Sequence, residues 1–197
     1  MPDDRTRVTR RDVLRGAGAA ALVGAITSAT SKRVEAAPGI KRFDARGAEL
    51  SFKINGKRHR AKVEPRTTLL DTLRDHLDLT GAKRVCDRGA CGACTIEVNG
   101  KTVNSCMMLA VDADGATIRT VEGLAQGEAL HAIQAAFIQH DALQCGFCTP
   151  GMLMSCAHLV ENVKHPTEDQ IRAAVAGNLC RCGTYPHVFA ACREAAK

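Results

Sequence analysis

The sequence is poor in aromatic residues and has no long apolar run. Its 197 residues include no Trp, one Tyr and five Phe, so any core must be built mainly from aliphatic side chains. Two small domains of that kind would be only marginally stable without a covalent or metal staple. The longest weakly apolar run, GAGAAALVGAITSAT at 16–30, is shorter than the roughly 20 apolar residues that cross a bilayer. No stable membrane span is therefore expected.

Two further kinds of signal are missing. The formal net charge is only +6, and the Lys and Arg residues are scattered, without the basic patches and interleaved aromatics that indicate nucleic-acid binding. None of the seven His residues is spaced i, i+4 from another, and no Ser-His-Asp, paired-carboxylate or phosphate-loop arrangement stands out. The sequence therefore predicts no catalytic residue and no nucleic-acid partner.

The first 36 residues resemble a twin-arginine export signal. Arg10 and Arg11 precede the weakly apolar run, and the tripeptide at 34–36 has small residues at the two positions that a signal peptidase reads. This route carries proteins that are already folded. We therefore predict that residues 1–36 direct the folded chain to the periplasm, and that residues 37–47 form an irregular lead-in.

Residues 48–122 are predicted to form a small α+β domain. The segment 49–54 alternates apolar and polar side chains, which is typical of a half-buried strand. Asn-Gly pairs at 55–56 and 99–100 stand between alternating segments and predict two hairpins. Thr68 is expected to be the N-cap of a helix between them.

Residues 123–197 are predicted to be all-helical, because apolar residues recur at helical spacing in four segments. Thr149 is expected to be the N-cap of the second helix. Thr167 and Gln170 form a capping-box pattern for the third helix, which is expected to end at Gly177. The residues expected along one face of the first helix are Leu130, Ile133, Phe137 and Ile138.

Four cysteines of the first domain have ferredoxin spacing. Their pattern is C-x4-C-x2-C-x11-C, and the first two gaps are those of a plant-type [2Fe–2S] ferredoxin. Gly89 and Gly92 lie within this loop and allow positive φ, so that the backbone can wrap a compact cluster and donate amide hydrogen bonds to its sulfurs. The four cysteines are Cys86, Cys91, Cys94 and Cys106.

Four cysteines of the helical domain form a second group with the pattern C-x2-C-x31-C-x-C. The first pair comes directly before a predicted helix, where free N–H groups and the helix dipole stabilise thiolates, and the second pair follows a helix end. Two such loops facing each other would form a second four-thiolate site. Its members are Cys145, Cys148, Cys180 and Cys182. Cys156 and Cys192 fall on apolar helix faces and are expected to be buried thiols.

Other uses of these cysteines remain open. Zinc also takes four thiolates, although usually from two C-x2-C pairs. Disulfides are common in exported cysteine-rich chains, but thiolates that hold a metal before export need not oxidise. A redox C-x2-C motif would follow a strand, whereas here a helix precedes it. A binding module stapled by zinc or disulfides therefore stays as an alternative.

Three motifs together resemble a known family. CDRGACGACTIEVNG at 86–100, QCGFCTPGM at 144–152 and GNLCRCGTYP at 177–186 are similar to the small iron–sulfur subunit of the xanthine dehydrogenase/aldehyde oxidase family of molybdenum hydroxylases. The resemblance covers about residues 48–197. With its export signal, the chain looks most similar to the small subunits of periplasmic aldehyde oxidoreductases.

The resemblance implies a β-grasp ferredoxin domain followed by a four-helix domain, each holding one [2Fe–2S] cluster. The first cysteine group would hold the outer cluster. The second group would hold the inner cluster, next to the molybdopterin of a separate large subunit that Gln144 and Cys182 would approach. Hydroxylation of an aldehyde or N-heterocycle would occur in that subunit. Electrons would leave through the two clusters to a flavin subunit, a cytochrome or another acceptor, and the alternative is a stand-alone two-cluster carrier.

One departure from the family pattern lies after the last predicted ligand. Many relatives read Cys-Arg-Cys-Thr-Gly-Tyr, whereas here Gly183 comes directly after Cys182. Glycine should leave the backbone freer at this point, which bears on the contact with the pterin more than on cluster binding. The same order also occurs in two-subunit members of the family, so the substrate class stays open.

Overall fold

The computed structural model describes residues 10–11 and 41–196. Apart from Arg10 and Arg11, the predicted export signal at 1–36 lies outside these residues, as does the first part of the lead-in at 37–47. Phe43–Lys197 forms one compact unit. Among the described residues, no helix combines the length and the apolar character that crossing a membrane requires.

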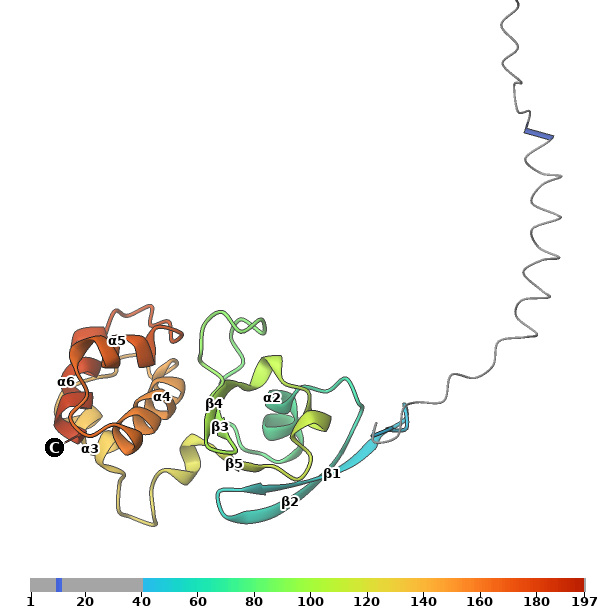
Figure 1. The fold of residues 1–197 in the computed structure, drawn as a ribbon, viewed down its shortest axis with the longest axis horizontal. Coiled ribbons are helices and arrows are strands. Elements are labelled where there is room, and N and C mark those ends of the chain that lie inside the picture. Colours follow the sequence, from blue (N-terminus) through green and yellow to red (C-terminus); the bar gives the residue numbers. More distant parts are fainter. Residues whose placement is uncertain (1–9, 12–40, 197) are drawn as a thin grey trace, which may run out of the picture. The chain divides into compact units, whose positions relative to one another are not determined.

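A five-stranded mixed sheet forms the first part of this unit (Figure 1), with the strand order β2-β1-β5-β3-β4. β1 pairs antiparallel with β2 and parallel with β5, and β3 pairs antiparallel with both β4 and β5. β2 and β4 are therefore the two edges. The strands are β1 (Ala48–Ile54), β2 (Lys57–Val63), β3 (Thr95–Val98), β4 (Lys101–Asn104) and β5 (Thr117–Arg119).

The predicted alternation and both predicted hairpin turns are confirmed. Every second residue of β1 is buried, including Leu50, Phe52 and Ile54. Both residues of the turn Asn55–Gly56 have positive φ, at 49° and 81°, and Asn99–Gly100 repeats this with 48° and 75°. Two-residue turns of type I′ require such values. The turn therefore fixes the register that points the apolar side chains of β1 into the core.

One helical segment packs against the sheet. It begins as α2 (Leu69–Asp71) and continues as a π-helical turn over Thr72–His76. Thr68 is its N-cap, as predicted, because its hydroxyl accepts a hydrogen bond from the Asp71 N–H at 3.1 Å. The buried residues of this segment are Leu69, Leu70, Thr72 and Leu73. The sheet and this segment therefore share one apolar core.

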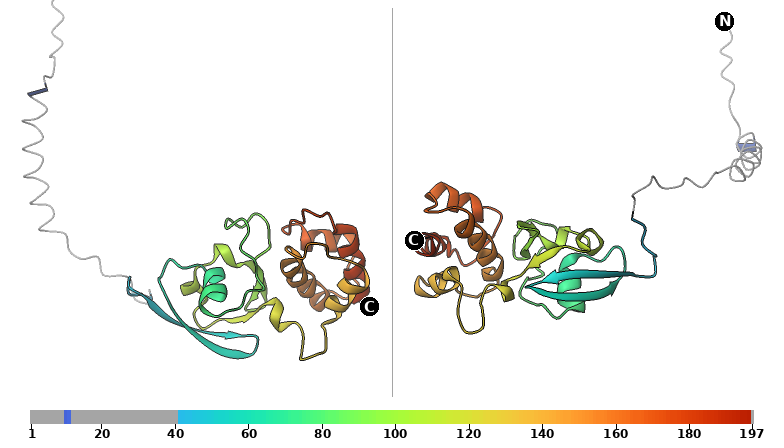
Figure 2. Two further views of the ribbon diagram at one scale, coloured as in Figure 1. Left: turned by 180° about the vertical axis from the view of Figure 1, so that it is seen from behind. Right: turned by 60° about the horizontal axis from the view of Figure 1, so that its bottom comes forward.

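Four further helices pack around a separate apolar core. They are α3 (Ala132–Gln139), α4 (Thr149–Asn162), α5 (Glu168–Val175) and α6 (Tyr185–Ala195). Both views in Figure 2 show them together on one side of the sheet. α4 contacts β3 and β4, so it joins the helical domain to the sheet domain. The fold class is therefore α+β, as predicted.

In the helical domain, two predicted helix caps are wrong and one is confirmed. Thr149 is the first residue of α4, because Cys148 already has helical dihedral angles and takes the cap position. The C-cap of α5 is Ala176, so Gly177 follows the cap instead of forming it. The predicted capping box at the start of α5 is present, with the side chains of Thr167 and Gln170 both bonded to the backbone.

The expected apolar face of α3 is only half correct. Ile133 and Phe137 are fully buried, whereas Leu130 and Ile138 are 50% and 62% exposed. Leu130 lies before the helix, which His131 caps with its side chain. Ile138 follows Phe137 directly, and a step of one residue turns a helical side chain by about 100°. These two apolar side chains therefore do not belong to the helical core.

Candidate metal centres

The first cysteine group gathers around the loop that leads into β3. Cys86, Cys91 and Cys94 lie on this loop, and Cys106 lies in the 3-10 turn Ser105–Met107 after β4. The thiols form two pairs within hydrogen-bonding reach, Cys86 with Cys91 and Cys94 with Cys106. Cys86 is also close enough to Cys106 to influence its ionisation. The two pairs therefore lie near each other, and we call this group of thiols the outer site.

Backbone N–H groups point at the sulfurs of the outer site. The Gly89 N–H donates to Cys106 Sγ at 3.3 Å, and a hydrogen bond from the Arg88 N–H is the largest cause that lowers the pKa of Cys86 to about 7. Asp87 and Gly89 have positive φ values of 50° and 69°, which turn the loop amides inwards. Burial instead raises the pKa of Cys106 to about 11. The loop therefore points backbone N–H groups at the sulfurs of Cys86 and Cys106.

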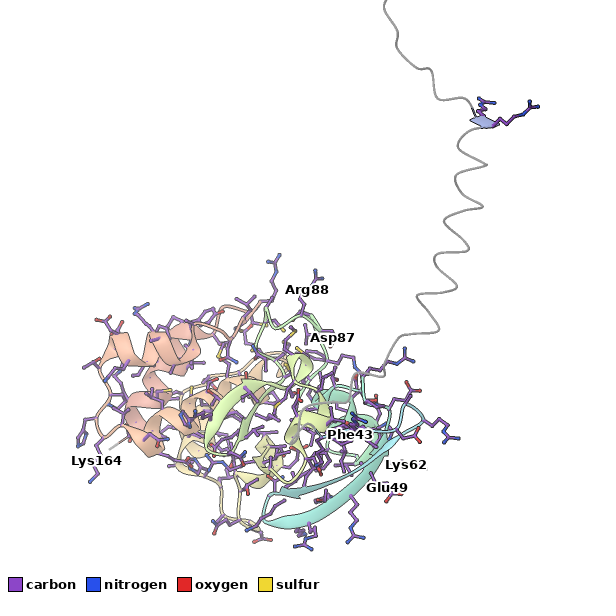
Figure 3. All side chains as sticks on the ribbon, turned by 45° about the vertical axis from the view of Figure 1, so that its right-hand side comes forward. Phe43, Glu49, Lys62, Asp87, Arg88 and Lys164 are labelled. Carbon is purple, nitrogen blue, oxygen red and sulfur yellow. The ribbon has the colours of Figure 1, made fainter. Side chains whose placement is uncertain are left out.

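The outer end of this loop is open. Figure 3 shows Asp87 and Arg88 there, with Arg88 pointing away from the rest of the molecule. The Arg88 Nε–H donates to the Cys86 carbonyl oxygen at 3.3 Å, so this side chain braces the backbone beside the first thiol. Val85 and Met107 flank the cysteines in sequence and are 52% and 65% exposed.

The second cysteine group comes from two segments that flank helices. Cys145 and Cys148 lie at the start of α4, and Cys180 and Cys182 lie between α5 and α6. The thiols again form two pairs, Cys148 with Cys180 and Cys145 with Cys182. Each pair takes one thiol from each segment. The two loops therefore face each other, as the sequence predicted, and we call this the inner site.

The two pairs of the inner site have different surroundings. Burial raises the pKa of Cys148 to about 12. Burial would raise the pKa of Cys180 as well, but hydrogen bonds from the hydroxyl and the N–H of Thr184 contribute to lowering it to about 7. The Thr184 hydroxyl oxygen lies 3.2 Å from Cys180 Sγ. Cys145 and Cys182, in contrast, are exposed.

Both sites fit a binuclear cluster. The four thiolates of a [2Fe–2S] cluster are shared between its two irons, and each site presents two pairs of thiols. All ten cysteines are free of disulfide bonds. In the part of the chain that the structure describes, no three His, Cys, Asp or Glu side chains gather as a group that could hold a metal ion. Thr149, next to Cys148, has a buried hydroxyl oxygen that lacks a partner among these residues, and a cluster sulfur would supply one.

Exposed residues surround the open pair of the inner site. Gln144, directly before Cys145, is exposed. Phe147 and Leu179 stand beside inner-site cysteines in the sequence and are 53% and 57% exposed. Large apolar side chains beside a charged centre are costly to leave in water. Exposed apolar side chains therefore stand next to inner-site cysteines in the sequence.

A hydrogen-bonded junction connects the two sites. The Leu179 N–H donates to the Cys91 carbonyl oxygen at 2.9 Å, and Leu179 directly precedes Cys180. The side chain of Asn178 donates to the Gly92 carbonyl oxygen at 2.9 Å. One hydrogen bond and a short run of covalent bonds therefore connect a thiol of the outer site to a thiol of the inner site.

Sequence reasoning missed three residues that hold the inner loop. These are Asn178, Thr184 and Tyr185, all within the motif at 177–186. The Tyr185 hydroxyl accepts a hydrogen bond from the Cys180 N–H at 2.9 Å and donates one to the Asn178 carbonyl oxygen at 3.0 Å. Tyr185 is the one tyrosine of the chain, and this was the available signal that it has a particular role.

The sheet domain, the helical domain and their two thiol sites define a two-centre iron–sulfur protein. Comparison with protein families agrees with this class. Residues 52–125 match the family described as "2Fe-2S iron-sulfur cluster binding domain", and residues 120–193 match the family described as "[2Fe-2S] binding domain". The chain therefore contains two [2Fe–2S]-binding domains, as predicted.

Relatives of known identity narrow this class to one family. The chain is 40% identical to the aldehyde oxidoreductase iron-sulfur-binding subunit PaoA of Escherichia coli K12, over 96% of this chain and 88% of the relative. It is 48% identical to the nicotine 6-hydroxylase small subunit of Paenarthrobacter nicotinovorans, over 75% of this chain and 88% of the relative. It belongs to the small iron–sulfur subunits of the xanthine dehydrogenase/aldehyde oxidase family of molybdenum hydroxylases, which transfer electrons within these enzyme complexes.

Solved structures share the same fold. Quinoline 2-oxidoreductase from Pseudomonas putida 86 contains a chain that matches with a TM-score of 0.71 and 46% identity, over 77% of this chain and 96% of that chain. The aldehyde oxidoreductase from Desulfovibrio desulfuricans matches with a TM-score of 0.72 and 38% identity, over 75% of this chain but 17% of that chain. In the second protein the matching region is therefore a small part of a much longer chain.

Proposed function

We propose that each of the two sites holds one [2Fe–2S] cluster. Cys86, Cys91, Cys94 and Cys106 would be the ligands of the outer cluster, and Cys145, Cys148, Cys180 and Cys182 those of the inner cluster. The two-plus-two pairing of thiols and the amide donors around Cys86 and Cys106 support this assignment. Bound clusters supply one-electron redox chemistry, and the chain itself holds, insulates and connects them.

The difference in enclosure supports a direction of electron flow. We propose that the open side of the inner site docks onto a large molybdopterin-binding subunit, with Gln144 and Cys182 nearest the pterin. The exposed apolar side chains of Phe147 and Leu179 support an interface there. Electrons would enter at the inner site, cross the hydrogen bond between Leu179 and Cys91, and leave from the outer site. The observation that carries the proposal is this junction, because it gives the chain a short hydrogen-bonded path along which electrons can pass from one site to the other.

The departure after the last ligand affects this docking. Gly183 has a positive φ of 77°, and a Cβ added there would meet no atom within 4 Å. An open left-handed glycine beside Cys182 gives this backbone freedom to adapt to the pterin.

The substrate and the acceptor belong to the proposed partners. The relatives described above belong to an aldehyde oxidoreductase, a nicotine 6-hydroxylase and a quinoline 2-oxidoreductase. We propose that the large partner of this chain hydroxylates an aldehyde or an N-heterocycle with oxygen derived from water. A flavin subunit, a cytochrome or another acceptor would receive the electrons at the outer site.

We also propose that residues 1–36 are a twin-arginine signal and that the mature subunit works in the periplasm. The lead-in would then span 37–47, the ferredoxin domain 48–122 and the helical domain 123–197. The alignment with the Escherichia coli subunit covers 96% of this chain, so it extends into the proposed signal, which supports a shared leader. Fusing residues 1–40 to a folded reporter should export it. Replacing Arg10 and Arg11 by Lys should stop export, and equal export of that variant would contradict the signal.

Purification from the native host tests the main proposal. The chain should co-elute with a much larger chain and a pterin, and the dithionite-reduced complex should give two distinct [2Fe–2S] EPR signals at low temperature. Elution alone with both signals would instead identify a stand-alone carrier. A colourless protein would identify a binding module.

A further inference from the structure

Asn178 fixes the contact between the two sites. Its side chain is 3% exposed and bonds to three different segments. Nδ2 donates to the Gly92 carbonyl oxygen at 2.9 Å and to Thr95 Oγ1 at 3.3 Å, and Oδ1 accepts from Ser155 Oγ at 2.7 Å. Both donor positions and the oxygen of the amide therefore have partners. The outer loop, β3 and α4 are all held to this one residue.

The main chain of Asn178 is held as firmly as its side chain. Tyr185 uses one hydroxyl to bond the Asn178 carbonyl oxygen and the Cys180 N–H, so it spans the peptide groups on either side of Leu179. The Asn178 N–H donates to the Val175 carbonyl oxygen at 2.9 Å, which ties the same turn to α5. With both of its ends fixed, Leu179 presents its N–H to the outer loop.

The junction between the two sites has no free space for an added side-chain atom at two of its glycines. A Cβ added to Gly92 would lie 2.4 Å from the Gly177 carbonyl oxygen and 2.6 Å from Asn178 Nδ2. A Cβ added to Gly151 would lie 2.1 Å from the Gly92 carbonyl oxygen. Protein interiors do not accommodate contacts this short without movement. At these glycines, backbone therefore packs directly against backbone where the outer loop, the inner loop and the start of α4 meet.

We propose that Asn178, braced by Tyr185, is a positioning residue for electron transfer between the two sites, an inference that rests on the cluster ligands proposed above. It keeps the Cys91 carbonyl oxygen in contact with the Leu179 N–H. Electronic coupling falls steeply with distance and is weaker across an empty gap than through bonds, so a small separation of the loops slows transfer. Removing the amide donor would leave the Gly92 carbonyl oxygen with hydrogen bonds only from Thr95 on its own side of the junction, so the side-chain link between the two loops would be lost.

The test uses the full chain with both clusters bound and the substitution Asn178→Asp. Aspartate keeps the size and the oxygen that accepts from Ser155, but it sets a carboxylate oxygen against the Gly92 carbonyl oxygen. Iron per chain and both EPR signals should be retained, and the magnetic splitting between the two reduced clusters should weaken. After rapid one-electron reduction, equilibration between the sites should be severalfold slower than in the wild type.

Two further variants make this test decisive. Ser155→Ala is the matched control, because it removes a hydrogen bond to the same amide and leaves the bond to Gly92 intact, so splitting and rate should stay at the wild-type values. Tyr185→Phe loosens the turn without adding charge, and it should slow equilibration in the same direction. If Asn178→Asp does not retain both clusters, Tyr185→Phe alone decides the test: slower equilibration supports the positioning role, and wild-type equilibration contradicts it.

The outcomes separate this inference from the proposed function. If Asn178→Asp and Tyr185→Phe both keep full iron content and show the wild-type magnetic splitting and equilibration rate, the positioning role is overturned and the ligand assignment stands. A wild-type chain that gives fewer than two EPR signals at full iron content would overturn the ligand assignment, and the positioning role with it.

Discussion

The outer and inner sites present the same number of thiols but enclose them differently. The outer site draws all four from one stretch, 86–106, where two of the thiols are 3% and 7% exposed. The inner site draws two from each of two segments at helix ends, and one of its pairs is exposed. A glycine-containing loop can wrap sulfur with its own amides, whereas rigid helix ends can present thiolates but cannot surround them. Under the function proposed above, the outer site would be complete within this chain and the large partner would cover the inner one.

The largest expected effect comes from removing one ligand at each site. Cys91→Ser should abolish the outer cluster and Cys148→Ser the inner one, because serine offers iron a far weaker ligand than a thiolate, so iron per chain should fall by about half in each variant. Iron analysis and EPR measure this, with a different signal lost in each case. Cys156→Ala is the control: this thiol is fully buried in the helical core, and both clusters should remain. Unchanged iron in either ligand variant would falsify the assignment.

Chelation sharpens the contrast in enclosure. In the isolated subunit, a strong iron chelator should remove the inner cluster several times faster than the outer one, because Cys145 and Cys182 are exposed while Cys94 and Cys106 are buried. Following the two EPR signals over time measures the difference. Assembly with the large partner should slow loss from the inner site only. Equal rates at the two sites would contradict the idea that the inner site is left open.

A glycine substitution tests whether the two sites share one rigid junction. Gly151→Ala should lower the free energy of unfolding by about 1–3 kcal/mol, because its Cβ has no space against the outer loop. Gly177→Ala is the matched control: a Cβ at Gly177 would meet no atom within 4 Å, so the change should stay within about 0.5 kcal/mol. Urea unfolding followed by circular dichroism measures both. Equal stability of the two variants would show that the junction has room to adjust.

The smallest expected effect lies at a second contact between the two domains. Arg119 of β5 donates to Glu161 of α4 at 2.7 Å, and this bond lowers the pKa of Glu161 below its usual 4.5. Since the folded-state pKa is the lower one, the stabilisation is complete above pH 4.5 and is lost as the pH falls through the folded-state value.

Glu161→Gln should therefore cost about 0.5–1 kcal/mol at neutral pH, a modest value because the Glu161 side chain is one-third exposed. The cost should vanish in acid, which urea unfolding at several pH values measures. Glu168→Gln removes exposed ion pairs with Arg172 and Arg193 and should cost less than Glu161→Gln. A cost at Glu161 that does not depend on pH would point to packing instead of charge.

Local signals predicted the parts of the fold that local chemistry determines. The Asn-Gly turns, the Thr68 cap and the alternation in β1 depend on residues next to each other, and all are confirmed. The outer group of cysteines could be predicted from a spacing that matches a known loop geometry, whereas the inner group rested on the expected positions of helix ends and its C-x-C spacing is not diagnostic. Cys156 and Cys192 are fully buried, as their apolar helix faces predicted.

Long-range contacts decided what the sequence pattern could not. Nothing beside Asn178 in the sequence indicates that its amide bonds to a loop more than eighty residues away. Leu130 and Ile138 have the spacing of buried residues, but the start of α3 and the position of its neighbours leave them exposed. Cys148 replaces Thr149 as the helix cap because the chain already turns helically there.

The two glycines at the junction also limit how this protein can change over generations. Position 92 lies in one domain and position 151 in the other, and neither tolerates a Cβ while its neighbours stay in place. A gene that joins the ferredoxin half of one relative to the helical half of another would yield a working subunit only if position 92 in the first half and position 151 in the second are both glycine.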